Sequence, residues 1–345
     1  MITMKDVARA AGVSRTAVSY AFSDSNNISA ETKKNILSIA AAMGYQPHKF
    51  AQSLRTQKSL NIGVVVEDIS VFLSPDIING ICEEGESLGY SIVLTNLRTH
   101  KKIGDSFYKF DEYIMEVNHI IKNNIAPYVD GIIYVGIHTR NVKGVADNCE
   151  KPVVYCYCYA GENSPCAMIE QEKMSYSIIR HFYELGHRNI SIIAGRVDSG
   201  VTFARLAGCK KAFDELQFPV ENYHIVFGDW EVEKGYTLAK KLLTVKNPPT
   251  AIFAMNDKMA SGVLKACREL NIHVPDDLSV VGFDNRSFSA YCTPALSTVD
   301  LSLNELGKES VLLLMDYINN PQTPPKQIII DGKYLERETV ARAHD

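Results

Sequence analysis

Residues 4–22 read MKDVARAAGVSRTAVSYAF, and this stretch predicts two short helices joined by a tight turn. Thr3 can cap the first helix, over residues 4–11, because a threonine followed three residues later by an acid is typical of a helix start. Gly12 permits the left-handed backbone that a tight turn requires. Ser14 can cap the second helix, over roughly residues 15–22. The alanines at the crossing would let the two helices approach closely.

A third helix is expected over about residues 30–43, with Ser29 as its cap and Gly44 at its end. Two short helices closed by a third form a helix-turn-helix unit. In such units the second helix places its first side chains on base edges in the major groove. Arg15, Thr16 and Tyr20 can reach outward there, and an arginine can fork onto guanine. The alternative is an ordinary three-helix unit with a solvated arginine.

Charge separates this helical segment from the rest of the chain. Residues 1–60 contain eight Lys and Arg but three Asp and Glu, whereas the whole chain carries a net charge of −4. The remainder is therefore strongly acidic. A basic segment on an acidic protein predicts that the N-terminal part approaches a polyanion such as DNA.

Composition excludes several classes of protein. The 345 residues predict two or three domains, and we expect neither a membrane span nor a secretory leader, because no apolar run is long enough for a span and residues 1–10 have no apolar segment. Eight cysteines without close pairing fit a reducing cytoplasm. Cys156, Cys158 and Cys166 lack a second pair or a histidine at ligand spacing, so we expect buried thiols and no metal. Neither a dinucleotide fingerprint nor a P-loop occurs, so no cofactor is expected.

From Asn61 onward, apolar strands alternate with amphipathic helices. This alternation predicts an α/β fold with parallel sheets and helices on both faces. Ligands bind such sheets beyond the carboxyl ends of the strands. The polar residues that follow predicted strands are therefore candidate ligand contacts: Asp68, Ser70, Asn256, Asp257 and Asp284.

Residues 4–22, together with ISAETKKNILSIAAAMGYQPHKFAQSLR at 28–55, resemble the lactose/galactose repressor (LacI/GalR) family, and the resemblance extends through the whole chain. It implies a helix-turn-helix head over residues 1–47, a hinge helix or linker over 48–59, and an effector-binding and dimerisation body over 60–345. The body should form two periplasmic-binding-protein-like subdomains. We expect the first over about 60–160 plus 292–320, and the second over about 161–291 plus 321–345.

The resemblance also implies which residues contact DNA. The family usually carries arginine where Tyr20 stands, and Tyr20 cannot make a forked contact with guanine, so the common half-site is in doubt. In the family, two hinge helices enter the minor groove and a leucine wedges into a central base step. The matching residue is Leu54, with Ala51 beside it, although a simple contact between Leu54 and the body is the alternative. The expected DNA-binding residues are Thr3, Ser14, Arg15, Thr16, Ser19, Tyr20, Asn27, His48, Ala51, Leu54 and Arg55.

An effector cleft follows from the same resemblance. Trp230 stands where lactose-type members stack a tryptophan on a sugar, and Arg205 where an arginine holds hydroxyls or a carboxylate. Asp257 can accept hydrogen bonds from two neighbouring hydroxyls. The alternatives are a core tryptophan, a structural salt bridge and a helix cap. The expected effector-binding residues are Asp68, Ser70, Phe72, Tyr157, Arg205, Trp230, Asn256, Asp257 and Asp284; the family often has Asp or Asn where Tyr157 stands.

Together these features predict a cytoplasmic, ligand-responsive transcription regulator, specifically a repressor of carbohydrate-utilisation genes. Its expected partners are a pseudo-palindromic double-stranded operator, a sugar effector and a second copy of the chain. A purine or nucleoside corepressor is the alternative effector. A sugar-processing α/β enzyme is the alternative from another class, although no catalytic motif is present. The tail lacks coiled-coil heptads, which favours a dimer over a tetramer. Residues 98–128 form a longer segment than is usual in the family, and we expect a solvated loop followed by a helix there.

Overall fold

The computed structural model describes residues 2–22, 27–45, 58–104 and 112–344. The chain packs as two units, one of residues 1–60 with 128–130 and one of the remainder, and each is described by itself. None of the helices in the described ranges is long and apolar enough to cross a bilayer.

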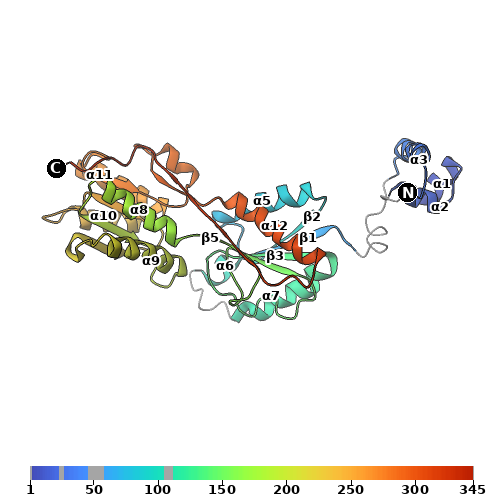
Figure 1. Ribbon diagram of the computed structural model, residues 1–345, viewed down its shortest axis with the longest axis horizontal. Helices are drawn as coiled ribbons and strands as arrows, with labels where there is room; N and C mark the ends of the chain where they lie inside the picture. The colour runs from blue at the N-terminus through green and yellow to red at the C-terminus, as the bar shows by residue number, and fades with distance from the viewer. Residues whose placement is uncertain (1, 23–26, 46–57, 105–111, 345) are drawn as a thin grey trace. The chain divides into compact units, whose positions relative to one another are not determined.

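The N-terminal unit contains the three predicted helices, α1 (Met4–Ala11), α2 (Arg15–Ala21) and α3 (Ala30–Ala42) (Figure 1). The backbone N–H and the hydroxyl of Thr3 both donate to Asp6, at 3.0 and 2.6 Å, so this side chain closes the first turn of α1. Ser14 accepts from the N–H of Ala17 at 3.0 Å. Gly12 adopts φ +65°, in the left-handed region where a side chain would strain the turn.

A small apolar core holds these helices together. Val7, Val18 and Ile36 are fully buried, one from each helix, and alanines from all three helices lie beside them. Small side chains at the crossings allow the close approach that the sequence predicted. Leu37 is exposed, since it lies one residue away from the buried side of α3.

The first subdomain of the body is a six-stranded parallel sheet in the order β11-β5-β4-β3-β1-β2. Helices α5 and α12 cover one face, and α6 and α7 cover the other (Figure 1). Gly80 and Gly307 let α5 and α12 touch, because a Cβ at either position would overlap the backbone of the other helix. The strands are β1 (Asn61–Val66), β2 (Ser91–Asn96), β3 (Gly131–Val135), β4 (Val153–Cys156), β5 (Cys166–Ile169) and β11 (Gln327–Ile330), and the helices are α5 (Leu73–Ser87), α6 (Thr99–Ile103), α7 (Ile114–Ile120) and α12 (Leu303–Asn319).

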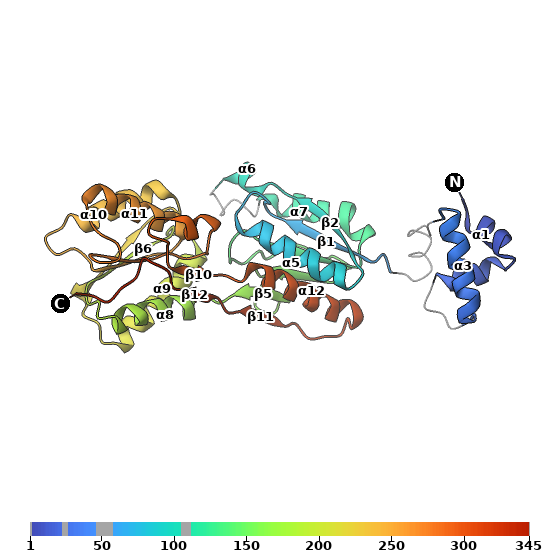
Figure 2. The same cartoon turned by 90° about the horizontal axis from the view of Figure 1, so that it is seen from above.

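The second subdomain is a four-stranded parallel sheet in the order β7-β6-β8-β9. Helices α10 and α11 cover one face, and α8 and α9 the other (Figure 2). The strands are β6 (Ile190–Ala194), β7 (Tyr223–Phe227), β8 (Ala251–Ala254) and β9 (Ser279–Val281), and the helices are α8 (Glu172–Glu184), α9 (Gly200–Glu215), α10 (Val232–Leu243) and α11 (Asp257–Leu270). The predicted α/β class is confirmed in both subdomains.

The subdomain boundaries differ from those expected. Residues 161–169 and 321–330 were expected in the second subdomain, but β5 and β11 pair with each other and complete the first sheet. Each strand has four residues, and so short an apolar run does not indicate which sheet it joins. Two further short strands, β10 (Thr298–Asp300) and β12 (Lys333–Leu335), form an antiparallel ribbon where the chain passes between the subdomains.

Candidate functional site

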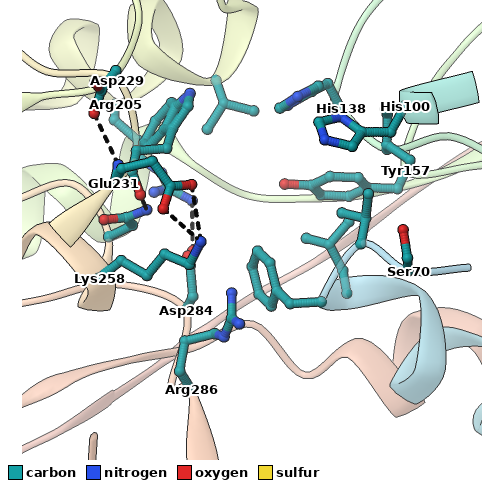
Figure 3. Close-up of a pocket in the computed structure, with 17 residues that line it drawn as sticks. Ser70, His100, His138, Tyr157, Arg205, Asp229, Glu231, Lys258, Asp284 and Arg286 are labelled. Carbon is teal, nitrogen blue, oxygen red and sulfur yellow. Dashed lines mark hydrogen bonds and ion pairs between the residues drawn. The ribbon is translucent and has the colours of Figure 1, made fainter. Parts of the chain in front are cut away.

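A pocket of about 560 Å³ opens between the two subdomains of the body, at the carboxyl ends of both sheets. Figure 3 shows side chains from both sides pointing toward the same space. From the first subdomain, residues after β1, β2, β3 and β4 line it; from the second, residues after β6, β7, β8 and β9. The lining is Ser70, Val71, Phe72, Leu73, His100, Ile137, His138 and Tyr157 on one side, and Val201, Arg205, Asp229, Trp230, Glu231, Asn256, Lys258, Asp284 and Arg286 on the other.

Trp230 lies in this lining with an unusual backbone. Its φ is +74°, and its ring packs directly on the backbone of Gly195, where a Cβ would overlap it. The side-chain N–H of Asn256 donates to the carbonyl of Trp230 at 2.9 Å and so fixes the loop. Among the described residues, the buried indole N–H of Trp230 has no acceptor. A buried donor without a partner costs free energy.

Arg205 and Asp284 form a buried pair on the second-subdomain side of the pocket. Arg205 is 2% exposed; its Nε donates to the side-chain oxygen of Gln171 at 2.8 Å, another N–H donates to the carbonyl of Met255, and its Nη2 lies 3.3 Å from Asp284 Oδ1. Its guanidinium stacks on Phe283, 3.7 Å from the ring centroid. Burial raises the pKa of Asp284 to about 6, although Arg205 opposes this shift. Arg205 is thus both a salt-bridge residue and part of the pocket lining.

Asp257 lies behind the pocket rather than in its lining. The hydroxyl of Thr298 donates to its Oδ1 at 2.5 Å, and the backbone N–H of Arg286 donates to its Oδ2 at 2.6 Å. Burial and the nearby Asp284 raise the pKa of Asp257 to about 7. Asn256, not Asp257, caps α11 by accepting from the N–H of Met259 at 2.8 Å. Asp257 therefore ties the start of α11 to the segments that pass between the subdomains, and its oxygens face protein donors.

Asp68 also lies outside the lining, whereas Ser70 and Phe72 belong to it. Burial acts to raise the pKa of Asp68, but hydrogen bonds from Ser70 and from the backbone of His100 outweigh it, so the pKa is lowered. The Ser70 hydroxyl donates to Asp68 at 2.6 Å within the loop after β1, and the backbone N–H of His100 donates to Asp68 at 3.0 Å, which joins that loop to α6. Asp68 thereby holds two neighbouring lining residues in place.

Tyr157 projects its hydroxyl into the pocket from the end of β4 (Figure 3). Its φ is +59°, a backbone conformation that Asn and Asp tolerate better than Tyr. This agrees with the family's frequent use of Asp or Asn at the matching position. Burial raises its pKa to about 12, so the phenol stays protonated and can donate. A residue larger and less acidic than aspartate thus occupies the middle of the pocket.

Several pocket residues were missed by sequence reasoning. His138, Lys258 and Arg286 all follow strands that the sequence predicted, so the rule that selected Asp284 could also have found them. Sequence reasoning also missed the ion pair of Glu67 and Arg140, which supports the pocket. The guanidinium of Arg140 donates two hydrogen bonds to the buried Glu67, at 2.7 and 2.9 Å, and so anchors the loop that carries His138.

The N-terminal unit presents its expected DNA-binding side chains in part. Arg15 and Thr16 are exposed at the start of α2, Tyr20 is half-buried on the same helix, and Ser14 is the cap of that helix. Thr3 and Asn27 are exposed, and Ser19 is half-buried. His48, Ala51, Leu54 and Arg55 lie outside the described residues, so their roles stay predictions.

The thiols of Cys156, Cys158 and Cys166 are buried and free. No group of three or more side chains able to hold a metal ion occurs within the described ranges. Burial raises the pKa of Cys156 to about 12, as expected for an inert buried thiol.

Comparison with known proteins gives the family. Residues 3–48 match the model of bacterial regulatory proteins of the lacI family, and residues 179–340 match a periplasmic binding protein-like domain. Catabolite control protein A of Priestia megaterium is 30% identical over 321 residues, which cover 92% of this chain and 93% of that protein. The probable HTH-type transcriptional repressor ExuR of Bacillus subtilis is 30% identical over 99% of both chains.

Among solved structures, a lac repressor dimer bound to operator and the anti-inducer ONPF is similar, with a TM-score of 0.79 and 26% identity over 99% of each chain. A putative LacI-family regulator from Rhizobium etli has a TM-score of 0.73 over 82% of this chain, at 26% identity. The match to the lac repressor covers the N-terminal helices and both α/β subdomains in one alignment. The chain therefore belongs to the LacI family of bacterial transcription regulators and is not an enzyme.

Proposed function

We propose that this protein is a cytoplasmic repressor that binds a pseudo-palindromic operator as a homodimer. Arg15 and Thr16 of α2 read bases in the major groove, and a small polyhydroxylated effector in the pocket controls operator affinity. A dimer follows from the two-fold symmetry of such operators.

The observation that carries the proposal is the lining of the pocket. Strand ends of both subdomains supply hydroxyl, amide, carboxylate and cationic groups around one space, with an aromatic ring among them. A sugar offers hydroxyl oxygens for such donors and C–H faces for the ring. The alternative effector is a purine or nucleoside; a repressor named PurR from Pasteurella multocida is 29% identical.

Coupling to DNA requires two body states with different operator affinity. The groups around Asp257 support such a coupling, because Thr298 and Arg286 belong to segments that connect the subdomains. A ligand that contacts both subdomains favours the state in which they lie close, and linkage then changes the affinity for DNA.

The test combines operator selection with an effector panel. Purified full chain is used to select a site from randomised duplex DNA, and fluorescence anisotropy then measures affinity with and without sugars, sugar derivatives and nucleobases. A selected two-fold site whose affinity changes with one compound supports the proposal. Failure to enrich any duplex sequence contradicts the DNA-binding part, and a response to a nucleobase alone contradicts the polyhydroxylated effector.

A further inference from the structure

The charged groups of the pocket are mostly paired with each other. Lys258 Nζ lies 2.9 Å from both carboxylate oxygens of Glu231, and Arg205 pairs with Asp284. On the opposite side of the pocket, His138 adds no positive charge, because burial and the nearby Arg140 lower the pKa of its imidazole to about 4. At neutral pH, His138 is therefore an uncharged imidazole.

Arg286 is the exception. Its guanidinium lies over the ring of Phe72, 4.0 Å from the centroid, and within the described residues no carboxylate forms an ion pair with it. Its position is fixed through the backbone, since its N–H donates to Asp257 at 2.6 Å. Arg286 follows β9 of the second subdomain, and Phe72 precedes α5 of the first, so this contact crosses the pocket.

Stacking on an aromatic ring uses the flat face of a guanidinium and leaves its N–H groups directed outward in the plane. Those N–H groups suit the two oxygens of a carboxylate or of a phosphate. Figure 3 shows the Arg286 side chain pointing into the space bounded by Lys258 and Tyr157. Asp229 lies on the far side of that space, and Asp284, whose pKa Arg286 helps to lower, already pairs with Arg205.

We propose that the effector is an anionic carbohydrate whose carboxylate or phosphate group binds the guanidinium of Arg286 while Phe72 holds that guanidinium in place. The inference rests on the proposed function and narrows its effector class. The sugar ring would then extend toward Trp230 and Asn256, where hydroxyl groups meet donors and acceptors. An anion that bridges Arg286 and Tyr157 joins the two subdomains, which gives it a direct influence on their closure.

The competing interpretation is that Arg286 only latches the subdomains together through Phe72. A latch needs no anion, and removing it would weaken every ligand alike. A specific anion site makes a different prediction, because neutral sugars would be insensitive to the guanidinium.

The sole tryptophan of the chain, Trp230, lies in the pocket, so its intrinsic fluorescence reports binding directly. Full-length protein is titrated with D-glucose, D-gluconate, D-glucuronate and D-glucose 6-phosphate. The comparison is repeated with Arg286→Gln and Arg286→Lys. Arg268→Gln is the matched control, since Arg268 is an exposed arginine of α11 outside the lining.

We expect at least one anionic probe to bind about tenfold or more tightly than glucose. Tighter binding of gluconate or glucuronate would indicate a carboxylate site, and tighter binding of glucose 6-phosphate would indicate a phosphate site. Arg286→Gln should remove that preference, Arg286→Lys should keep part of it, and Arg268→Gln should keep all of it. Binding of glucose alone, binding of none of the anions, or equal loss for charged and neutral ligands in Arg286→Gln overturns the proposal. Operator selection by the same protein is unaffected by any of these outcomes, so failure here is distinguishable from failure of the repressor assignment.

Discussion

Asp257 offers the sharpest quantitative prediction about stability. Its pKa of about 7 in the folded body compares with an ordinary value of 3.8, because burial and Asp284 disfavour its charged form. The folded state therefore binds this proton more tightly than the unfolded chain does. Stability from this group is present at low pH and is lost as the pH rises from about 4 to about 7.

The magnitude follows from linkage. Between about pH 5 and about pH 8, a shift of this size removes about 2.5 kcal/mol from the free energy of unfolding. Ionisation of Asp284, whose pKa is about 6, also lowers the free energy of unfolding as the pH rises, over a lower part of that range. Asp257→Asn keeps the size of the side chain but cannot ionise, so its free energy of unfolding should fall much less over this interval.

Urea unfolding of the full chain, followed by far-ultraviolet circular dichroism at several pH values, measures this difference. Asp276→Asn is the matched control, because Asp276 is an exposed carboxylate of the same subdomain. We expect the control to retain the parental pH dependence. Equal loss of stability with pH in the parent and in Asp257→Asn would refute the reasoning, since another group would then carry the titration.

Three further predictions concern DNA and effector binding. Arg15→Ala should relax base preference at one half-site position at a cost of about 1–3 kcal/mol, as measured on a randomised half-site library; an unchanged preference would show that Arg15 does not read a base. Leu54→Ala should leave effector binding intact but reduce the operator bend in a circular-permutation assay, and an equal bend in parent and variant would count against the wedge. Gly195→Ala should displace the Trp230 ring, because the added methyl overlaps it. Its tryptophan emission should shift and effector affinity should fall by about tenfold or more, while operator binding without ligand persists; parental emission and affinity would contradict the packing argument.

Much of the pocket was predictable from the sequence because strand ends meet at one edge of a parallel sheet. Ser70, Asn256 and Asp284 were identified in this way and lie in the lining, whereas Trp230 and Arg205 were found through the resemblance to the family. The same rule could not separate Asp257 from Lys258, which follow the same strand. The first turn of α11 turns Asp257 toward Thr298 and leaves Lys258 at the pocket.

The sequence by itself determined the three-helix head and the alternating α/β body, since caps, glycine turns and apolar periodicity act over a few neighbouring residues. Tertiary structure decided the features that depend on distant residues. β5 and β11 form an edge of the first sheet although about 160 residues separate them, because hydrogen bonds between strands carry no local signature. Likewise, Arg286 faces the pocket because its backbone is held by Asp257, and it forms no ion pair with any described residue because Asp284 and Glu231 already have partners. Which charges are neutralised depends on distances through space, and those are set only when both subdomains are packed.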